Sequence, residues 1–240
     1  MRSLNIDSML ECYDISPERG FALSTPSITT FADPQFQPWT DAAKDLQKLI
    51  SAHQLRSTIN GWPVLSPQYL VSLEEYRLAY VLLGHLTHAY IWGSHEEEDP
   101  LPAIPASLSI PFLEIVQELE VPVGVCFAST ALWNYTIQSD GKEGCLCSFT
   151  GTGDEAHFNL TSYRVEAAGA AALTSALLAS RLSTAGSAAI EQVTSHLQGV
   201  AQSLSRCREE LTKMKNGSSP NIIHFNIVPY LVGSMVFNSS

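Results

Sequence analysis

The feature that most constrains the fold is the apolar stretch from Ser72 to Gly93, which reads SLEEYRLAYVLLGHLTHAYIWG. Ser72 is a favoured helix N-cap, Glu74 and Glu75 suit the positive end of a helix dipole, and Gly93 suits the left-handed turn that ends a helix. Between these caps, apolar side chains cover nearly the whole circumference, which is typical of a buried helix. The uninterrupted apolar runs are shorter than the roughly 20 residues that span a bilayer. We therefore predict a core helix, and no membrane span, with the rest of the chain packed on it.

Two histidines of this helix, His85 and His88, lie three positions apart and so share a face. That spacing can present two nitrogens to a metal ion, but no acidic or cysteine partner follows one turn later and no H-E-x-x-H pattern occurs. We interpret the pair as hydrogen-bonded core histidines, and metal ligation is the alternative.

Apolar periodicity predicts further helices and few strands, so the predicted fold class is all-α. The predicted helices cover 41–55 with Thr40 as its cap, 111–119 beginning at Pro111, 124–137, 158–180 and 187–214, followed by a helical segment 222–233 broken at Pro229. Residues 1–37 are expected to form an extended arm laid over the core through Tyr13 and several other aromatic and aliphatic side chains. The residues from 138 to 156 are rich in Gly, Asp and Thr and predict a domain boundary.

The two longest predicted helices have distinctive faces. Residues 167–172 are all Ala or Gly, which suits either close helix packing or a flat ligand against the backbone. The next helix carries two apolar heptad series, Ile190, Leu197, Leu204, Leu211 and Val193, Val200, Cys207, Met214. Because the connection at 181–186 is short, an antiparallel hairpin with the preceding helix is favoured over the alternative, a coiled-coil dimer.

Charge and motifs exclude several functions. The chain has 240 residues, and 13 basic against 24 acidic residues give a net charge of -11, which argues against nucleic acid and anionic membrane surfaces as partners. The acidic run at 95–99 is expected to be a solvated loop. Five cysteines without a C-x-x-C pair, and no apolar leader at the N-terminus, predict a reducing, cytoplasmic location. No P-loop, nucleophile elbow or dinucleotide motif occurs, so pattern alone identifies no reaction.

Several stretches, in the same order, resemble the indoleamine 2,3-dioxygenase family, and its fungal branch most. They read YDISPERGF at 13–21, RLAYVLLGHLTHAYIWG at 77–93 and LPAIPASLSIPFLEIVQELEVPVGV at 101–125. The likeness continues through CFASTALWNY at 126–135 and HFNLTSYRVEAAGAA at 157–171, and weakly through VPYLVG at 228–233. It covers nearly the whole chain, and the combination is more specific than any single piece.

The resemblance implies a helical fold with a heme between a small and a large domain. Residues 1–150 would form the small domain with its arm, and 151–240 part of the large one. The implied activity is heme-dependent insertion of both atoms of O2 across the indole C2–C3 bond of tryptophan or a related indole, in tryptophan catabolism or specialised metabolism. The implied cofactor is heme, and the implied partners are O2 and an indole-type small molecule.

The resemblance also assigns pocket residues. Phe127 matches an aromatic residue that lines the distal pocket, Thr130 a neighbour that faces the indole, and Phe158 an aromatic residue near the substrate ring. Ser162 matches the serine above the heme. Core packing alone is the alternative explanation for each of the two phenylalanines.

Two family positions carry other residue types here. Val228 stands where the family has an arginine that binds the substrate carboxylate, and Ile223 stands where it has an aromatic residue. Because valine forms no charge-assisted bond, the resemblance supports tryptophan itself less well than other indoles.

The family's proximal heme histidine lies beyond Ser240, so the chain is interpreted as truncated before it, with heme retention and tryptophan cleavage impaired. No residue of the chain is assigned as a catalytic group or a metal ligand. The alternatives are a non-catalytic helical protein that binds a flat ligand, or that self-associates through the heptad seam, and an incomplete gene product.

Overall fold

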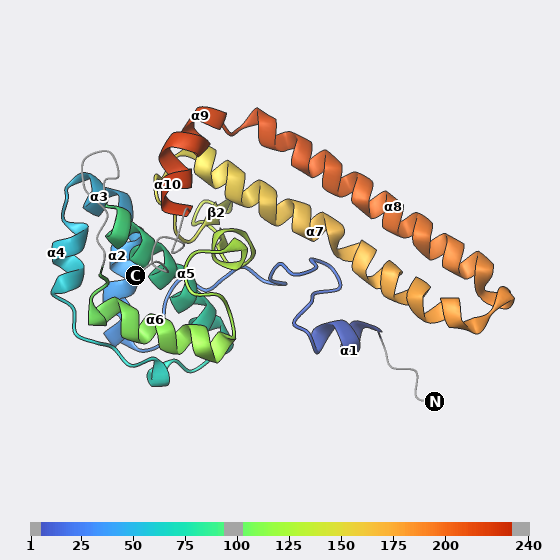
Figure 1. Ribbon diagram of the computed structural model, residues 1–240, viewed down its shortest axis with the longest axis horizontal. Coiled ribbons are helices and arrows are strands. Elements are labelled where there is room, and N and C mark those ends of the chain that lie inside the picture. The colour runs from blue at the N-terminus through green and yellow to red at the C-terminus, as the bar shows by residue number, and fades with distance from the viewer. Residues whose placement is uncertain (1–5, 94–102, 232–240) are drawn as a thin grey trace, which may run out of the picture. The chain divides into compact units, whose positions relative to one another are not determined.

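The structure, a computed structural model, describes residues 6–93 and 103–231 (Figure 1). It divides into two compact units, each built from two chain segments: Met1–Thr25 with Leu160–Gly217, and Pro26–Asn159 with Ser218–Ser240. These units interleave along the chain, whereas the sequence predicts one boundary near residue 150. The family-type division into 1–150 and 151–240 stays a prediction. The acidic run at 95–99 and the predicted helix end at Gly233 lie outside the described residues.

The second unit is organised around α5, Leu73–Trp92, as predicted. The Ser72 side chain accepts a hydrogen bond from the Glu75 amide at 3.3 Å, and Gly93 ends the helix with φ at 56°. Fifteen of the 20 helix residues are buried, which confirms a core helix. The chain packs helices against it from several directions, chiefly α2 (Gln37–Lys44), α4 (Leu55–Asn60), α6 (Ala106–Leu119) and α10 (Val228–Leu231).

The single helix predicted over 41–55 is wrong. The structure has α2, then α3 (Leu46–Ser51), then α4, with Thr40 inside α2 and not at its start. The chain leaves helical geometry at Asp45, with φ −99° and ψ 14°, and turns at His53, whose φ is 54°. The predicted buried face survives these breaks, because Ala43, Leu46, Ile50 and Leu55 are all buried.

The prediction that a helix begins at Pro111 is also wrong. Helix α6 begins at Ala106, with Pro105 as its N-cap, and carries Pro111 in its interior. Proline has no N–H, so it cannot donate to the carbonyl of Ser107 one turn earlier. Burial of Leu108, Phe112 and Ile115 against the core compensates for that lost hydrogen bond.

The helix predicted over 124–137 is replaced by a short π-helical turn, Ala128–Leu132, and a β-hairpin. Strands β1 (Tyr135–Ile137) and β2 (Glu143–Cys145) are antiparallel, with Tyr135 opposite Cys145. Asn134, which is buried, ends the helical geometry, since its side-chain amide pairs with both the N–H and the C=O of Cys147 at 2.9 Å. Tertiary hydrogen bonds thus override the helical preference of an apolar run.

The last described segment is helical but irregular. It comprises α9 (Pro220–Ile222), a π-helical turn (Ile223–Ile227) and α10. The predicted break at Pro229 corresponds to the π-helical turn that precedes it, and Pro229 itself lies within α10. A π turn at this point is reasonable, because proline cannot donate the hydrogen bond of a regular α-helix.

The first unit contains a long antiparallel hairpin of α7 (Gly153–Leu182, whose first residues belong to the second unit) and α8 (Ile190–Thr212), which lie side by side (Figure 1). Ser203 donates to the Ala168 carbonyl at 2.8 Å, and the Cys207 thiol lies 3.5 Å from the Val165 carbonyl oxygen. A Cβ placed on Gly169 would lie 3.4 Å from the Cys207 sulfur. The predicted hairpin is confirmed, and the small residues of α7 serve to bring α8 close.

The arm is more regular and less buried than predicted. It contains a helix, α1 (Ile6–Glu11), and an isolated bridge between Ser16 and Gly20. Tyr13 and Phe21 are exposed, whereas Phe36 is fully buried beside Trp39. The described residues are mostly helical, as the predicted fold class requires, and none of their helices has the length and hydropathy to cross a membrane.

Candidate functional site

The candidate site begins with Tyr80 of α5, which fixes the segment that leads into Phe127 and Thr130. The Tyr80 hydroxyl lies 2.9 Å from the Pro122 carbonyl oxygen, 3.1 Å from that of Gly124 and 3.1 Å from the Cys126 sulfur. Its ring stacks on Phe112 and meets Trp133 edge-on. Burial raises the pKa of this phenol well above its usual value, so it remains a neutral hydrogen-bonding group.

His88, two turns further along α5, ties two distant segments to the same helix. Its Nδ1–H donates to the Tyr230 carbonyl at 2.6 Å, and its Nε2 accepts the Val125 amide at 3.0 Å. These two bonds specify one neutral tautomer. Burial lowers the pKa of the ring, which also favours the neutral form. Gly124 has φ 102°, and a Cβ there would lie 2.9 Å from the His88 Nε2 atom, so the close approach requires glycine.

The predicted pocket residues Phe127 and Thr130 follow this anchored segment. Thr130 is half-buried and donates through its hydroxyl to the Cys126 carbonyl at 3.1 Å. Phe127 remains 51% exposed although it is adjacent to a tightly bonded backbone. An aromatic side chain held in this way presents apolar surface that a flat ligand can cover.

The predicted residues Ile223 and Val228 lie at the two ends of the π-helical turn, and the Val228 amide donates to the Ile223 carbonyl. Both are half-buried. Tyr230 holds this turn in place: its ring stacks on Phe149 at 4.7 Å and 2°, and its hydroxyl donates to the Gly93 carbonyl at 2.9 Å. No charged side chain stands at either predicted position, so neither can pair with a carboxylate.

Phe158 and Ser162 lie four residues apart on α7 and therefore on the same face of that helix. The division between the units falls between them, so Phe158 belongs to the second unit and Ser162 to the first. The buried carboxylate of Glu155 secures the start of α7, because it accepts from the Phe149 and Thr150 amides at 2.8 and 2.7 Å. Phe158 follows Glu155 by one turn.

Two of the predicted pairs, Phe127 with Thr130 and Ile223 with Val228, thus lie in segments that are hydrogen-bonded to the same helix, α5, through His88. Sequence reasoning assigned no role to Tyr80, Asn134 or Glu155, which fix the backbone around these pairs. A phenol in an otherwise apolar helix is a usable signal for such an anchor, because a buried hydroxyl needs a partner. His88 and Tyr230 are 142 residues apart in the sequence, so no local pattern indicates their contact.

The interpretation of His85 and His88 as core histidines is confirmed. His85 is fully buried, donates from Nδ1 to the Val81 carbonyl at 2.8 Å and lies against the Phe149 ring at 4.7 Å. Burial lowers the pKa of His85 to about 4. Within the described part of the chain, no group of three or more His, Cys, Asp or Glu side chains is arranged to hold a metal ion.

Comparison with known proteins identifies the sequence. The model of the family described as "Indoleamine 2,3-dioxygenase" matches residues 9–239. An indoleamine 2,3-dioxygenase of Saccharomyces cerevisiae is 34% identical over 239 residues, which cover 94% of this chain and 52% of that protein. One from Aspergillus nanangensis is 31% identical over 240 residues, with 94% and 56% covered. A 6-hydroxytryptophan 2,3-dioxygenase of Fusarium equiseti is 25% identical over 237 residues, with 96% and 57% covered. The chain spans a little over half the length of these relatives.

Proposed function

Because the chain belongs to the indoleamine 2,3-dioxygenase family, we propose that it forms the substrate-side wall of a heme pocket in an enzyme that opens an indole ring between C2 and C3. The observation that carries this proposal is the shared anchoring of both candidate segments by His88. The bound heme would supply the iron that activates O2. Both oxygen atoms enter the product, so the ring opening consumes no external reductant.

The residues fit one face of such a group. Phe127, Thr130, Phe158, Ile223 and Val228 offer aromatic and aliphatic surface with one hydroxyl, as an apolar macrocycle and an indole ring require. In this proposal Phe127 and Phe158 exclude water from the substrate ring, and Ser162 keeps the hydroxyl role that the resemblance assigns to it. We assign no iron ligand within the described residues, and His85 and His88 are committed to core contacts.

We propose that the substrate is an indole whose binding does not require a carboxylate to be paired at position 228. One relative carries in its name 6-hydroxytryptophan, a ring-hydroxylated tryptophan that keeps its carboxylate. Val228 removes the charge that would bind the carboxylate of tryptophan, so we expect residues 1–240 alone to cleave little or no tryptophan. The five free cysteines agree with a cytoplasmic location, which is part of this proposal.

Hemin titration tests the pocket. Phe127→Ala should lower the affinity for hemin about tenfold, because it removes a large apolar contact. The change in the Soret band during the titration measures this affinity. Tyr69→Ala is the matched control, since Tyr69 is 52% exposed and outside the predicted site. Equal hemin affinity for the wild type and Phe127→Ala would refute the proposed pocket.

A second candidate function is self-association through α8. One of its heptad series, Ile190, Leu197, Leu204 and Leu211, is between 54% and 63% exposed, while the other series faces α7. Residues spaced by seven form one row along a helix, so we propose that a second copy of the chain covers this row. Light scattering should show a dimer that Leu197→Glu with Leu204→Glu dissociates. Ser195→Glu with Gln202→Glu, on exposed positions of the same helix, should leave it intact, and a monomeric wild type would exclude the dimer.

A further inference from the structure

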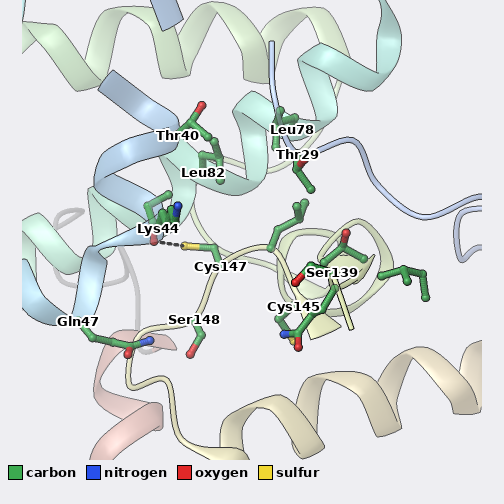
Figure 2. Close-up of a pocket in the computed structure, with 15 residues that line it drawn as sticks. Thr29, Thr40, Lys44, Gln47, Leu78, Leu82, Ser139, Cys145, Cys147 and Ser148 are labelled. Carbon is green, nitrogen blue, oxygen red and sulfur yellow. Dashed lines mark hydrogen bonds between the residues drawn. The ribbon is translucent and has the colours of Figure 1, made fainter. Parts of the chain in front are cut away.

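A cavity of about 600 Å³ lies within the second unit, between α2, α5 and the β-hairpin. Its size falls in the range of small-molecule sites. None of the six predicted pocket residues lines it. Figure 2 shows Thr40, Lys44 and Gln47 following one another along one side, with Cys145, Cys147 and Ser148 facing them.

The walls of this cavity are held in place by contacts already made. Asn134 pins the backbone of Cys147, and the Cys147 thiol points to the Ala43 carbonyl oxygen at 4.0 Å (Figure 2). The Ser148 hydroxyl donates to Glu155 at 2.9 Å and accepts the Gly151 amide at 2.8 Å. The site is therefore formed before any ligand arrives, which lowers the entropic cost of binding.

The lining combines apolar and polar surface with a single charge. Leu78, Leu82 and Leu146 give it an apolar part, and hydroxyl and amide groups surround them. Lys44 is the only charged side chain in the lining, and no carboxylate belongs to it. Burial raises the pKa of Cys145 to about 12 and that of Cys147 further, so both thiols stay neutral at physiological pH.

Lys44 differs in its ion pairing from Lys48, the next lysine along the chain. Lys48 forms an ion pair with Asp45 at 2.6 Å. Lys44 is exposed and also acts on the neighbouring Asp45 carboxylate through its charge, but no ion pair joins it to any residue in the described part of the chain. The chain as a whole carries a net charge of -11, so a cavity with one cation and no acid stands out from its surroundings. Such a cavity suits an anion and disfavours a cation.

We propose that this cavity is a second binding site of the protein, for a compact monocarboxylate with an apolar body. The carboxylate pairs with Lys44, and the apolar body lies against Leu78, Leu82 and Leu146. Gln47, which follows Lys44 on the same side of the cavity, can donate a further hydrogen bond to the carboxylate. The site does not depend on heme or on the proposed ring-opening activity.

Calorimetric titration of the hemin-free chain tests this site with two probes of one shape, phenylacetate and its neutral amide, phenylacetamide. The wild type should bind phenylacetate more tightly than the amide. Lys44→Met keeps the side-chain stem and should reduce phenylacetate affinity about tenfold, to the level of the amide. Lys48→Met is the matched control and should change neither affinity.

Ser139→Trp provides a second variant, because Ser139 is exposed at the cavity wall and a large ring there should block both probes without disturbing the core. The proposal is overturned if the wild type binds neither probe or does not distinguish them. It is also overturned if Lys44→Met binds phenylacetate as the wild type does. None of these results concerns hemin binding, so failure of this site can be distinguished from failure of the proposed heme pocket.

Discussion

Helices α5 and α8 are similar in length but differ sharply in how they are used. In α5, 15 of 20 residues are buried, whereas in α8 only Ser203 of 23 residues is. Helix α5 is covered on all sides and carries the polar side chains that fix the candidate site. Helix α8 packs by one face onto α7 and leaves a row of large aliphatic side chains in contact with solvent. Apolar residues at helical spacing therefore show that a helix has a partner, but not whether the chain itself supplies it.

The largest difference between the helices should appear in stability. Leu86 of α5 is fully buried, so Leu86→Ala should lower the free energy of unfolding by about 3 kcal/mol, through lost transfer energy and the cavity left behind. Leu204 of α8 is 58% exposed, and Leu204→Ala should cost less than about 0.5 kcal/mol in the monomer. Urea unfolding monitored by circular dichroism measures both. Equal losses would show that α8 is covered.

Acid should weaken α5 through His85. Its pKa is lowered from 6.5 to about 4, so the neutral ring stabilises the fold fully above pH 6.5, and that contribution is lost as the pH falls toward 4. The loss amounts to about 3 kcal/mol, because each tenfold preference for the neutral form is worth about 1.4 kcal/mol. Stability measured from pH 7 to pH 4 checks this, and His85→Gln should flatten the profile. An unchanged slope in that variant would assign the acid sensitivity elsewhere.

The role of α5 as an anchor can be separated from its role as core. His88→Leu keeps the apolar contacts but leaves the Val125 amide and the Tyr230 carbonyl without their partner, at a cost of about 2 kcal/mol. Hydrogen exchange should then accelerate at Val125 and across 228–231, with little change in α8. Uniform acceleration throughout the chain would mean that His88 supports the whole fold and not these two segments.

The smallest effect concerns recognition by α10. Val228→Arg places a cation where the resemblance predicts the family's carboxylate-binding arginine, and it should tighten binding of L-tryptophan about tenfold, with indole unaffected. Equilibrium dialysis measures both ligands. Asn221→Arg, an exposed position of α9, is the matched control for added charge. Equal gains for the two variants would exclude a specific role for position 228.

How much the sequence predicts follows from the range of the contacts involved. The limits of α5 follow from Ser72 and Gly93, whose capping is local, and the α7–α8 hairpin follows from its short connection. The segment 124–137 was predicted wrongly as a helix, because Tyr80 and His88 bind its backbone from elsewhere in the chain. The side chain of Asn134, within the segment, also pairs with the backbone of Cys147. The pocket residues Phe127, Thr130, Phe158, Ser162, Ile223 and Val228 come from resemblance alone and stay predictions. The cavity beside Lys44 was not predicted, since four separate segments form it.

In the proposed function, the segments around 127–130 and 223–228, held by α5, form one wall of a heme pocket. Hydrogen exchange measured by mass spectrometry with and without hemin tests it most directly. We expect hemin to protect both of these segments and to leave the amides of α8, 190–212, unchanged. Protection confined to α8, or absent from either segment, would contradict it, because hemin would then be bound to exposed apolar surface and not to the proposed site.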